Sequence, residues 1–399
     1  MSLFDRAELA PADPILGLTE AFNADERGDK VNLGVGVYLG EDGKLPLLAA
    51  VRAAEERLTG QHKAKAYLGI DGLPAYREAV RGLIFGADSP AIADGRVATV
   101  QSLGGTGALK IGADLLHQLD GDATVLISDP SWENHRALFT RAGFNVATYR
   151  YYDAAAKGID FDGMLADLHA AAPGTVVVLH ACCHNPTGYD LDSEQWDRVI
   201  AVIAERGLVP FLDMAYQGFG FGIAEDGSVV TKFVAAGLNF LLSTSYSKSF
   251  SLYGERIGSL SVVLDSAEAA RKVTSQLKIV IRTNYSNPPT LGATLVTTVL
   301  TDLELRRSWE DELGGMRERI KTLRKGLVDG LAARGISDMG FIAGQLGMFS
   351  YSGMTKDQMV ALRSEHGVYG LDSGRMCVAA LNTANLGRVA DAIAAVRSR

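Results

Sequence analysis

The sequence predicts an α/β fold, with one large, mainly parallel sheet of about seven strands and a smaller α+β unit. Two observations lead to this prediction. Between residues 97 and 263, short apolar stretches alternate with helical stretches, a rhythm typical of a parallel sheet with helices on both faces. After residue 290 the pattern changes to one long helix, followed by short strands and helices.

The composition is that of a soluble globular protein with room for two or three domains. Of 399 residues, 47% are hydrophobic and 22% are charged. No apolar run reaches the roughly 18 residues of a membrane helix, and the first residues lack the pattern of an export signal. The net charge of -8 opposes nonspecific binding to nucleic acid or anionic membranes. With three cysteines too few for a disulfide or zinc framework, we expect a cytoplasmic protein.

The elements follow in chain order. Residues 1–45 are expected to form loop and short strand, followed by helices over 47–58 and 74–85. Strands are expected over 97–102, 124–128, 145–151, 175–180, 209–212, 238–244 and 259–263. Helices between them are expected over 108–119, 135–142 and 193–206.

One helix is expected over residues 293–334 as a connector between domains, with further helices over 356–366 and 386–397. The expected domains are an N-terminal segment over 1–45 that joins the small domain, a large domain over 46–314 and a small domain over 315–399.

Lys248 lies in a serine-rich loop directly after the strand expected over 238–244. A free lysine titrates at about 10.4, so it becomes nucleophilic only where burial or a nearby cation lowers its pKa. Arg256 could supply that charge, while the alternative is a loop lysine in solvent. The motifs at other strand ends bear on this choice, because open α/β sheets bind ligands there.

Two of these motifs offer charge recognition. The stretch LGGTGALK from Leu103 opens a helix, where Gly105 and Thr106 suit a phosphate; the alternative is a glycine turn without a ligand. Asp213 ends an apolar strand, and a partly desolvated carboxylate is costly unless it faces a cation or accepts hydrogen bonds. A protonated ring nitrogen is such a cation, and a helix cap is the alternative.

Three further motifs offer polar or aromatic contacts. Asn185, before Pro186, can donate a hydrogen bond to a phenolate or a carboxylate. Trp132 could stack on a flat ring or pack in the core, and Arg375 is either a surface residue or a bidentate grip on a carboxylate. No metal is expected nearby, since alternate strand positions point to opposite faces; the residues concerned are His180, Cys182, Cys183 and His184.

Together these motifs resemble the class I aminotransferases, in particular the aspartate and aromatic amino acid aminotransferases, which are fold type I enzymes that use pyridoxal phosphate. The matching stretches are SxxK followed by Arg256, DxAYQGF, HNPTG, GGTGAL and SWENH. The resemblance covers nearly the whole chain, from PILGL around Ile15 to Arg375, and is strongest to the aromatic enzymes of proteobacteria.

The resemblance implies roles around the cofactor ring. Lys248 would attach the cofactor covalently and later shuttle the proton at the substrate Cα. Asp213 would pair with the pyridine nitrogen, with His135 behind it. Asn185 and Tyr216 would hydrogen-bond the phenolate oxygen, and the ring would stack on Trp132.

It also implies how phosphate and substrate are held. The phosphate would contact Gly105, Thr106, Ser245, Arg256 and, from a second subunit, Tyr67. Arg375, helped by Asn185 and the backbone at Gly36, would bind the substrate α-carboxylate, whereas Arg282 of the second subunit would bind a side-chain carboxylate. The implied assembly is therefore a homodimer with shared sites.

The implied reaction is a metal-free ping-pong transfer of the amino group of an aromatic amino acid or aspartate to 2-oxoglutarate. Apolar or small residues flank the substrate side chain and favour aromatic rings, namely Leu39, Leu45 and Ala66. The alternatives are a strict aspartate enzyme, a decarboxylase or β-lyase, and a silent cofactor-binding sensor. The chain departs from many aspartate enzymes at Gly104, where they carry serine, and at Cys377, where asparagine is common.

Overall fold

The computed structural model describes residues 2–9, 16–62 and 64–398. The chain divides into two compact units, which are described separately. The smaller unit comprises residues 1–44, 321–343 and 348–399, and the larger comprises residues 45–320 and 344–347.

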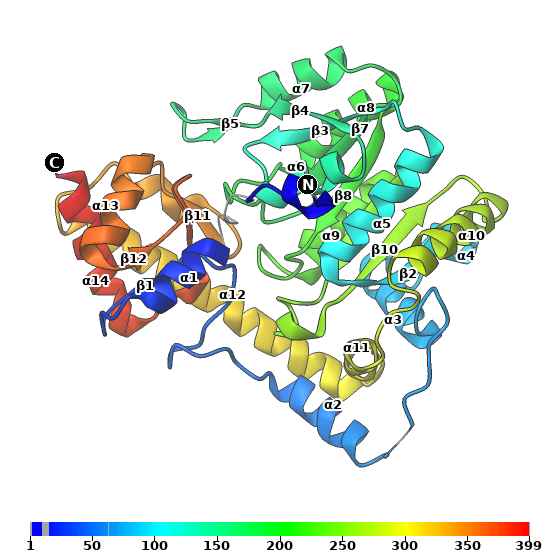
Figure 1. The fold of residues 1–399 in the computed structure, drawn as a ribbon, viewed down its shortest axis with the longest axis horizontal. Helices are drawn as coiled ribbons and strands as arrows, with labels where there is room; N and C mark the ends of the chain where they lie inside the picture. The colour runs from blue at the N-terminus through cyan, green and yellow to red at the C-terminus, as the bar shows by residue number, and fades with distance from the viewer. Residues whose placement is uncertain (1, 10–15, 63, 399) are drawn as a thin grey trace. The chain divides into compact units, whose positions relative to one another are not determined.

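In its described residues, the larger unit is built on a seven-stranded sheet with the strand order β2-β10-β9-β8-β7-β3-β4 (Figure 1). The strands are β2 Val97–Leu103, β3 Thr124–Asp129, β4 Asn145–Arg150, β7 Val176–His180, β8 Val209–Met214, β9 Phe240–Ser245 and β10 Ile257–Val263. β10 runs antiparallel to β2 and β9, whereas the remaining pairs are parallel. This confirms the expected mainly parallel sheet, each strand lying within a few residues of its predicted bounds.

Apart from the edge strand β4, which is largely exposed, the strands are buried along most of their length because both faces of the sheet are covered. Helices α5 Gly104–Leu119 and α10 Ala267–Asn284 pack on this sheet. Gly112 permits the close approach of α5, since a Cβ atom there would lie 2.5 Å from Phe211 Cζ. Packing therefore fixes the start of α5 beside the ends of the central strands.

The other helices of the larger unit follow the local signals of the sequence. They are α2 Ala49–Thr59, α3 Pro74–Phe85, α4 Pro90–Ala93, α6 Glu133–Arg141, α7 Phe161–Ala170, α8 Ser193–Arg206, α9 Ile223–Ala235 and the 3₁₀ turn Tyr253–Glu255; β5 Tyr152–Asp153 and β6 Gly158–Ile159 form a hairpin. α8 has the bounds predicted for it, because Asp192 forms a capping box with Gln195 and Gly207 ends the helix in the left-handed conformation.

The single helix expected over residues 293–334 is wrong. The chain forms two helices there, α11 Leu291–Thr301 and α12 Leu303–Ala332. Asp302 between them is extended, with φ -100° and ψ 121°, and its Oδ1 accepts hydrogen bonds from the backbone N–H groups of Glu304 and Leu305, both at 3.0 Å. A side chain that caps a new helix has interrupted the apolar periodicity.

No helix among the described residues is both long and apolar enough to cross a membrane.

The smaller unit pairs the start of the chain with its end. Its elements are α1 Leu16–Ala24, β1 Val31–Asn32, β11 Phe349–Tyr351, α13 Lys356–His366, β12 Val368–Tyr369, β13 Arg375–Cys377 and α14 Thr383–Arg397, with 3₁₀ turns at Leu3–Arg6, Gly340–Gly344 and Val378–Ala380. β1 pairs in parallel with β12, and β11 pairs antiparallel with β13.

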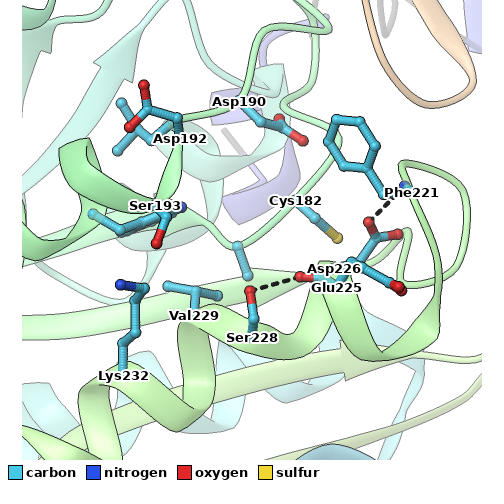
Figure 2. Close-up of a pocket in the computed structure, with 13 residues that line it drawn as sticks. Cys182, Asp190, Asp192, Ser193, Phe221, Glu225, Asp226, Ser228, Val229 and Lys232 are labelled. Atoms are coloured by element: carbon cyan, nitrogen blue, oxygen red, sulfur yellow. Dashed lines mark hydrogen bonds between the residues drawn. The ribbon is translucent and has the colours of Figure 1, made fainter.

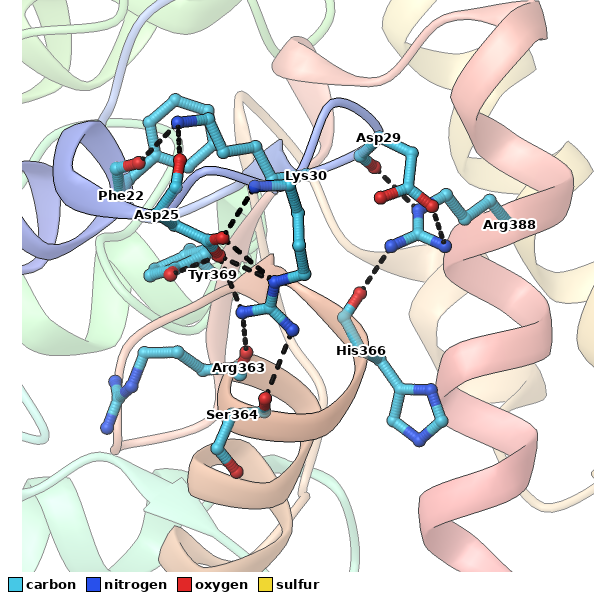
Figure 3. A network of polar contacts seen from close by, with 10 residues as sticks. Phe22, Asp25, Asp29, Lys30, Arg363, Ser364, His366, Tyr369 and Arg388 are labelled. Atoms are coloured by element: carbon cyan, nitrogen blue, oxygen red, sulfur yellow. Dashed lines mark hydrogen bonds and ion pairs between the residues drawn. The ribbon is translucent and has the colours of Figure 1, made fainter.

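A polar network ties the N-terminal part of this unit to the end of α13 (Figure 3). Arg27 forms an ion pair with Asp25 at 2.5 Å and donates to the carbonyl oxygens of Arg363 and Ser364, both at 3.0 Å. The Tyr369 hydroxyl donates to Asp25 Oδ2 at 2.7 Å. Arg27 thus adds a side-chain donor at the helix end, where the Arg363 carbonyl oxygen also accepts from the Gly367 N–H group at 3.1 Å.

Candidate active site

The candidate site lies at the carboxyl edge of the central strands, where side chains from three neighbouring strands meet. In the sheet register, His180 of β7 stands opposite Asp213 of β8, and Asp213 stands opposite Ser243 of β9. This edge is where open α/β sheets bind ligands. The sequence placed Asp213 at this edge, and the structure agrees.

Asp213 is 6% exposed and accepts a hydrogen bond from His135 Nε2 at 3.0 Å. His135 Nδ1 in turn lies 2.9 Å from the Ser131 hydroxyl. Burial acts to raise the pKa of Asp213, but the His135 hydrogen bond, together with the charges of His135, His180 and Lys248, outweighs it and holds that pKa below its usual value. Asp213 is therefore a buried carboxylate that stays ionised.

His184 is buried and His180 is half-buried at this edge, and desolvation of the rings holds the pKa of each well below the usual value. The ring centroids of His135 and His180 lie 5.0 Å apart, and those of His180 and His184 lie 4.2 Å apart. The lowered pKa values favour the neutral form of His180 and His184. Sequence reasoning named His135 but missed Ser131, whose signal was its position four residues earlier at the helix start.

The expectation that strand alternation keeps the side chains of residues 180–184 apart is wrong in part. β7 ends at His180, so the alternation rule no longer applies beyond it. Cys183 has a φ of 51°, which turns the chain and brings its thiol close to that of Cys182. The convergence depends on a backbone conformation that no residue type in this stretch announces.

Lys248 is half-buried, and its Nζ lies 4.9 Å from the centroid of the Tyr216 ring. Trp309 anchors the loop that carries Lys248, because its Nε1 donates to the Ser249 carbonyl oxygen at 2.7 Å. Phe250 stacks on the Trp309 ring at 4.5 Å. The interpretation of Lys248 as a loop lysine in solvent is therefore wrong.

A basic cradle forms where the start of α5 meets the start of β10. Gly104 has a φ of 69°, and a Cβ atom there would lie 2.5 Å from Arg256 Nη2. At Gly105 a Cβ atom would lie 3.2 Å from Ser245 Cβ. Arg256 Nη1 donates to Ser247 Oγ at 3.1 Å. A guanidinium group, a hydroxyl and the positive end of a helix thus converge, which suits an anion.

The remaining predicted ring contacts also belong to the larger unit. Asn185 is 3% exposed, and Asp190 fixes the turn before it by accepting hydrogen bonds from the N–H groups of Cys183 and His184, at 2.6 and 2.8 Å. Trp132 precedes α6 and meets the His135 ring edge-on, at 5.3 Å. Thr106 is half-buried in the first turn of α5.

Arg375, Gly36 and Leu39 belong to the smaller unit. Arg375 is 1% exposed, so its interpretation as a surface residue is wrong. Its Nη2 donates to the Gly34 carbonyl oxygen at 2.9 Å, and its guanidinium lies 4.4 Å from the Phe349 ring centroid. At Gly36 an added Cβ atom would lie 2.7 Å from Phe349 Cζ. The Phe349 ring can occupy this position because Gly36 has no side chain.

Four of the predicted residues are exposed on the single chain. Tyr67 is 92% exposed and Leu45 46%, and Ala66 is exposed beside Tyr67. Arg282 is exposed on α10, where its Nη1 contacts the Ser286 hydroxyl. In contrast Cys377 is buried, and its thiol donates to the Val37 carbonyl oxygen at 3.5 Å.

Known proteins are similar to this chain in sequence and in fold. Residues 28–393 match the family model described as aminotransferase class I and II. The chain is 57% identical to the aspartate aminotransferase of Pseudomonas aeruginosa and 50% identical to the aromatic-amino-acid aminotransferase of Escherichia coli; each alignment covers 99% of this chain and 100% of the relative. A crystal structure of the aromatic-amino-acid aminotransferase from Burkholderia pseudomallei, covalently bound to pyridoxal phosphate, is 61% identical with a TM-score of 0.97, and the match covers 99% of this chain and 100% of that chain.

Proposed function

This chain belongs to the class I and II aminotransferase family, and from that premise we propose that it is a pyridoxal-phosphate-dependent transaminase. It moves the amino group of an aromatic amino acid or aspartate to 2-oxoglutarate. The observation that carries the proposal is an ionised, buried Asp213 at the same sheet edge as the amine of Lys248, whose charge helps to lower the pKa of Asp213. Relatives named for both substrate classes support the dual preference.

The residues at this edge fit the proposed cofactor at both of its charged ends. The cradle at Gly104, Gly105, Ser245 and Arg256 suits its phosphate, because an added Cβ atom at either glycine would fill it. Asp213 suits a protonated ring nitrogen. Asn185, Tyr216 and Trp132 supply the remaining polar and aromatic contacts, and Thr106 adds a hydroxyl at the cradle. When bound, pyridoxal phosphate supplies an electron sink for the substrate Cα.

The chain's own groups then perform the proton transfers. The amine of Lys248 would act as the general base that takes the proton from the substrate Cα, and as the acid that later gives this proton back. Asp213 holds the ring nitrogen in its protonated form because its own pKa is low. His135 and Ser131 keep that carboxylate in one orientation.

Substrate carboxylates are bound by arginines. Arg375, with Asn185 and the backbone at Gly36, binds the α-carboxylate. We propose a homodimer in which Arg282 of one chain binds the side-chain carboxylate in the other chain's site, and Tyr67 crosses in the same way to the phosphate. The exposure of both residues on the single chain supports this assembly.

Three side chains at the proposed substrate pocket are apolar or small, which favours an aromatic substrate: Leu39, Leu45 and Ala66. Apolar walls stabilise a bound ring by about 25 cal/mol for each Å² removed from water. Arg282 has to turn away when a ring binds, because a buried guanidinium without a partner is costly. The proposal includes a cytoplasmic location, in keeping with three free cysteines.

Single-turnover spectroscopy tests this proposal. The cofactor-loaded protein is mixed separately with aspartate and phenylalanine, and the decay of the cofactor's absorbance band is recorded. Comparable rate constants per unit substrate support dual specificity. Decay with aspartate alone would leave a strict aspartate enzyme, the alternative that the 57% identical Pseudomonas relative favours. A protein that binds the cofactor without reacting with either substrate would contradict the enzyme proposal.

A further inference from the structure

A pocket in the larger unit is lined by side chains of the types that bind metal ions (Figure 2). Its volume is about 290 Å³, and its wall includes Cys182, Asp190 and Asp226. We propose that the cluster of Cys182, Cys183 and Asp226 beside this pocket binds a thiophilic divalent cation of the zinc class; Cys182 and Asp226 line the pocket itself. The proposal does not depend on the transaminase function.

The ligand atoms already lie close together. The two thiol sulfurs and a carboxylate oxygen of Asp226 are all within 4.8 Å of one another. Zinc binds thiolate sulfur at about 2.3 Å and carboxylate oxygen at about 2.0–2.2 Å, so small side-chain rotations complete the site. Thiolates select soft or borderline ions over magnesium and calcium. The open pocket leaves a fourth position for water.

The backbone holds this arrangement in place before any ion binds. Asp226 accepts hydrogen bonds from the N–H groups of Gly218, Gly220 and Phe221, at 2.8, 3.0 and 2.8 Å. Asp190 holds the turn at Cys183 through the N–H group of that residue, at 2.6 Å. Hydrogen bonds of this kind orient the ligands of natural metal sites.

The wall of the pocket is acidic, with Asp190 and Asp226 among its lining residues. Within the described part of the chain, neither Asp190 nor Asp226 forms an ion pair with a lysine or arginine. Lys232, on the same wall, instead donates to Asp197 at 2.6 Å. Asp192 and Glu225 add two more acidic groups. A divalent cation that displaces the two thiol protons leaves the net charge of the site unchanged, and the carboxylate of Asp226 is its third ligand.

Cadmium titration of the cofactor-loaded enzyme, kept reduced with a thiol-free reagent, tests the proposal. We expect one Cd²⁺ per chain by equilibrium dialysis and a cadmium–thiolate charge-transfer band in the ultraviolet. Cys182→Ser and Cys183→Ser should each abolish that band, and Asp226→Asn should weaken binding by at least about tenfold. Cys377→Ser is the matched control and should leave the band intact, because Cys377 is a buried free thiol of the smaller unit.

Wild-type protein alone provides a second measurement, should a serine variant fail to fold. Because all three thiols are buried, alkylation is followed in mild denaturant, where Zn²⁺ should lower the rates of Cys182 and Cys183 and leave the rate of Cys377 unchanged, as read by peptide mass mapping. Absence of the band in wild type, its persistence in the Cys182→Ser/Cys183→Ser double variant, or equal protection of all three cysteines would overturn the proposal.

Discussion

His135 Nε2 lies 3.0 Å from Asp213 Oδ2, with the His135 side chain fully buried and that of Asp213 7% exposed. Because the Ser131 hydroxyl occupies Nδ1 at 2.9 Å, this network assigns the ring proton to Nε2 and has His135 donate it to the carboxylate. The hydrogen bond from His135 thus helps to keep the carboxylate ionised. The negative charge of Asp213 is therefore available to pair with a positively charged group of a ligand.

The first prediction removes this charge. Asp213→Asn keeps the shape of the side chain but presents no anion to a ring nitrogen, so kcat should fall by about a hundredfold or more. Steady-state assays at saturating cofactor measure it. Asp197→Asn, at the surface ion pair with Lys232, is the control and should change kcat little; a similar small change in both variants would contradict the role given to Asp213.

The second prediction concerns Lys248. Lys248→Ala should still bind the cofactor but should show no turnover, since the amine that attaches it and moves the Cα proton is gone. Borohydride treatment followed by peptide mapping checks this, with a reduced adduct at Lys248 in wild type and none in the variant. Lys110→Ala, which removes a surface partner of Asp114, should retain the adduct. An adduct on another lysine in wild type would refute the assignment.

The third prediction separates the two substrate classes. Arg282→Ala removes a charged hydrogen-bond donor, so kcat/KM for aspartate should fall about ten- to a hundredfold. The value for phenylalanine should change by less than about threefold, because no carboxylate of that side chain is lost. Arg271→Ala, on the same helix, serves as the control. Equal losses for both substrates would show that Arg282 does not select dicarboxylates.

The fourth prediction tests the cradle. Gly104→Ala places a Cβ atom 2.5 Å from Arg256 Nη2 at a φ of 69°, so the arginine has to move and cofactor affinity should fall by about tenfold, or about 1.4 kcal/mol. Fluorescence titration of the apoenzyme measures it. Gly86→Ala, at a φ of 79° with nothing within 4 Å of the new Cβ, carries similar backbone strain and should leave cofactor affinity unchanged. Equal affinity in both variants would count against the cradle.

The fifth prediction concerns acid stability. The hydrogen bond from Arg27, followed by that from Tyr369, holds the pKa of Asp25 well below its ordinary value of 3.8. A lowered pKa stabilises the folded state above the unfolded value, and this stabilisation is lost as the pH falls below about 4. Asp25→Asn should therefore melt at a lower temperature at pH 7 and lose less on acidification than wild type.

Thermal melts at several pH values compare Asp25→Asn with Asp29→Asn. Asp29 forms an exposed ion pair with Arg388 at 2.8 Å in the same region (Figure 3), and exposed pairs contribute little. The control should keep the acid sensitivity of wild type. A parallel pH profile in both variants would mean that the Asp25 network does not set it.

The sheet was predictable because each strand is a short apolar run with polar residues at its end. Asp213 was predictable for the same reason, since it ends such a run. The helix break at Asp302 was not, because an aspartate that caps a new helix and one on a helix surface look alike in sequence. Both the expected domain boundary after residue 314 and the division between the compact units after residue 320 fall inside α12.

Contacts between distant segments escaped sequence reasoning as well. At Gly104, where many aspartate enzymes carry serine, the structure places the Arg256 guanidinium 2.5 Å from the position of an added Cβ atom, a contact that the sequence does not announce. The convergence of Cys182 and Cys183 was missed because it depends on the positive φ of Cys183. Such features depend on three-dimensional register and on backbone conformation, which local residue preferences do not encode.

The cradle depends on the register of the antiparallel pairing between β10 and β2. Ile257 pairs with Leu103, so Arg256 and Gly104 are each the next residue beyond the same rung of the ladder. A one-residue slip would turn every β10 side chain to the opposite face. The pairing of β10 with β2 thus fixes the position of Arg256 relative to Gly104. A redesign that lengthens the loop after Lys248 should keep this alignment only if Ile257 still pairs with Leu103.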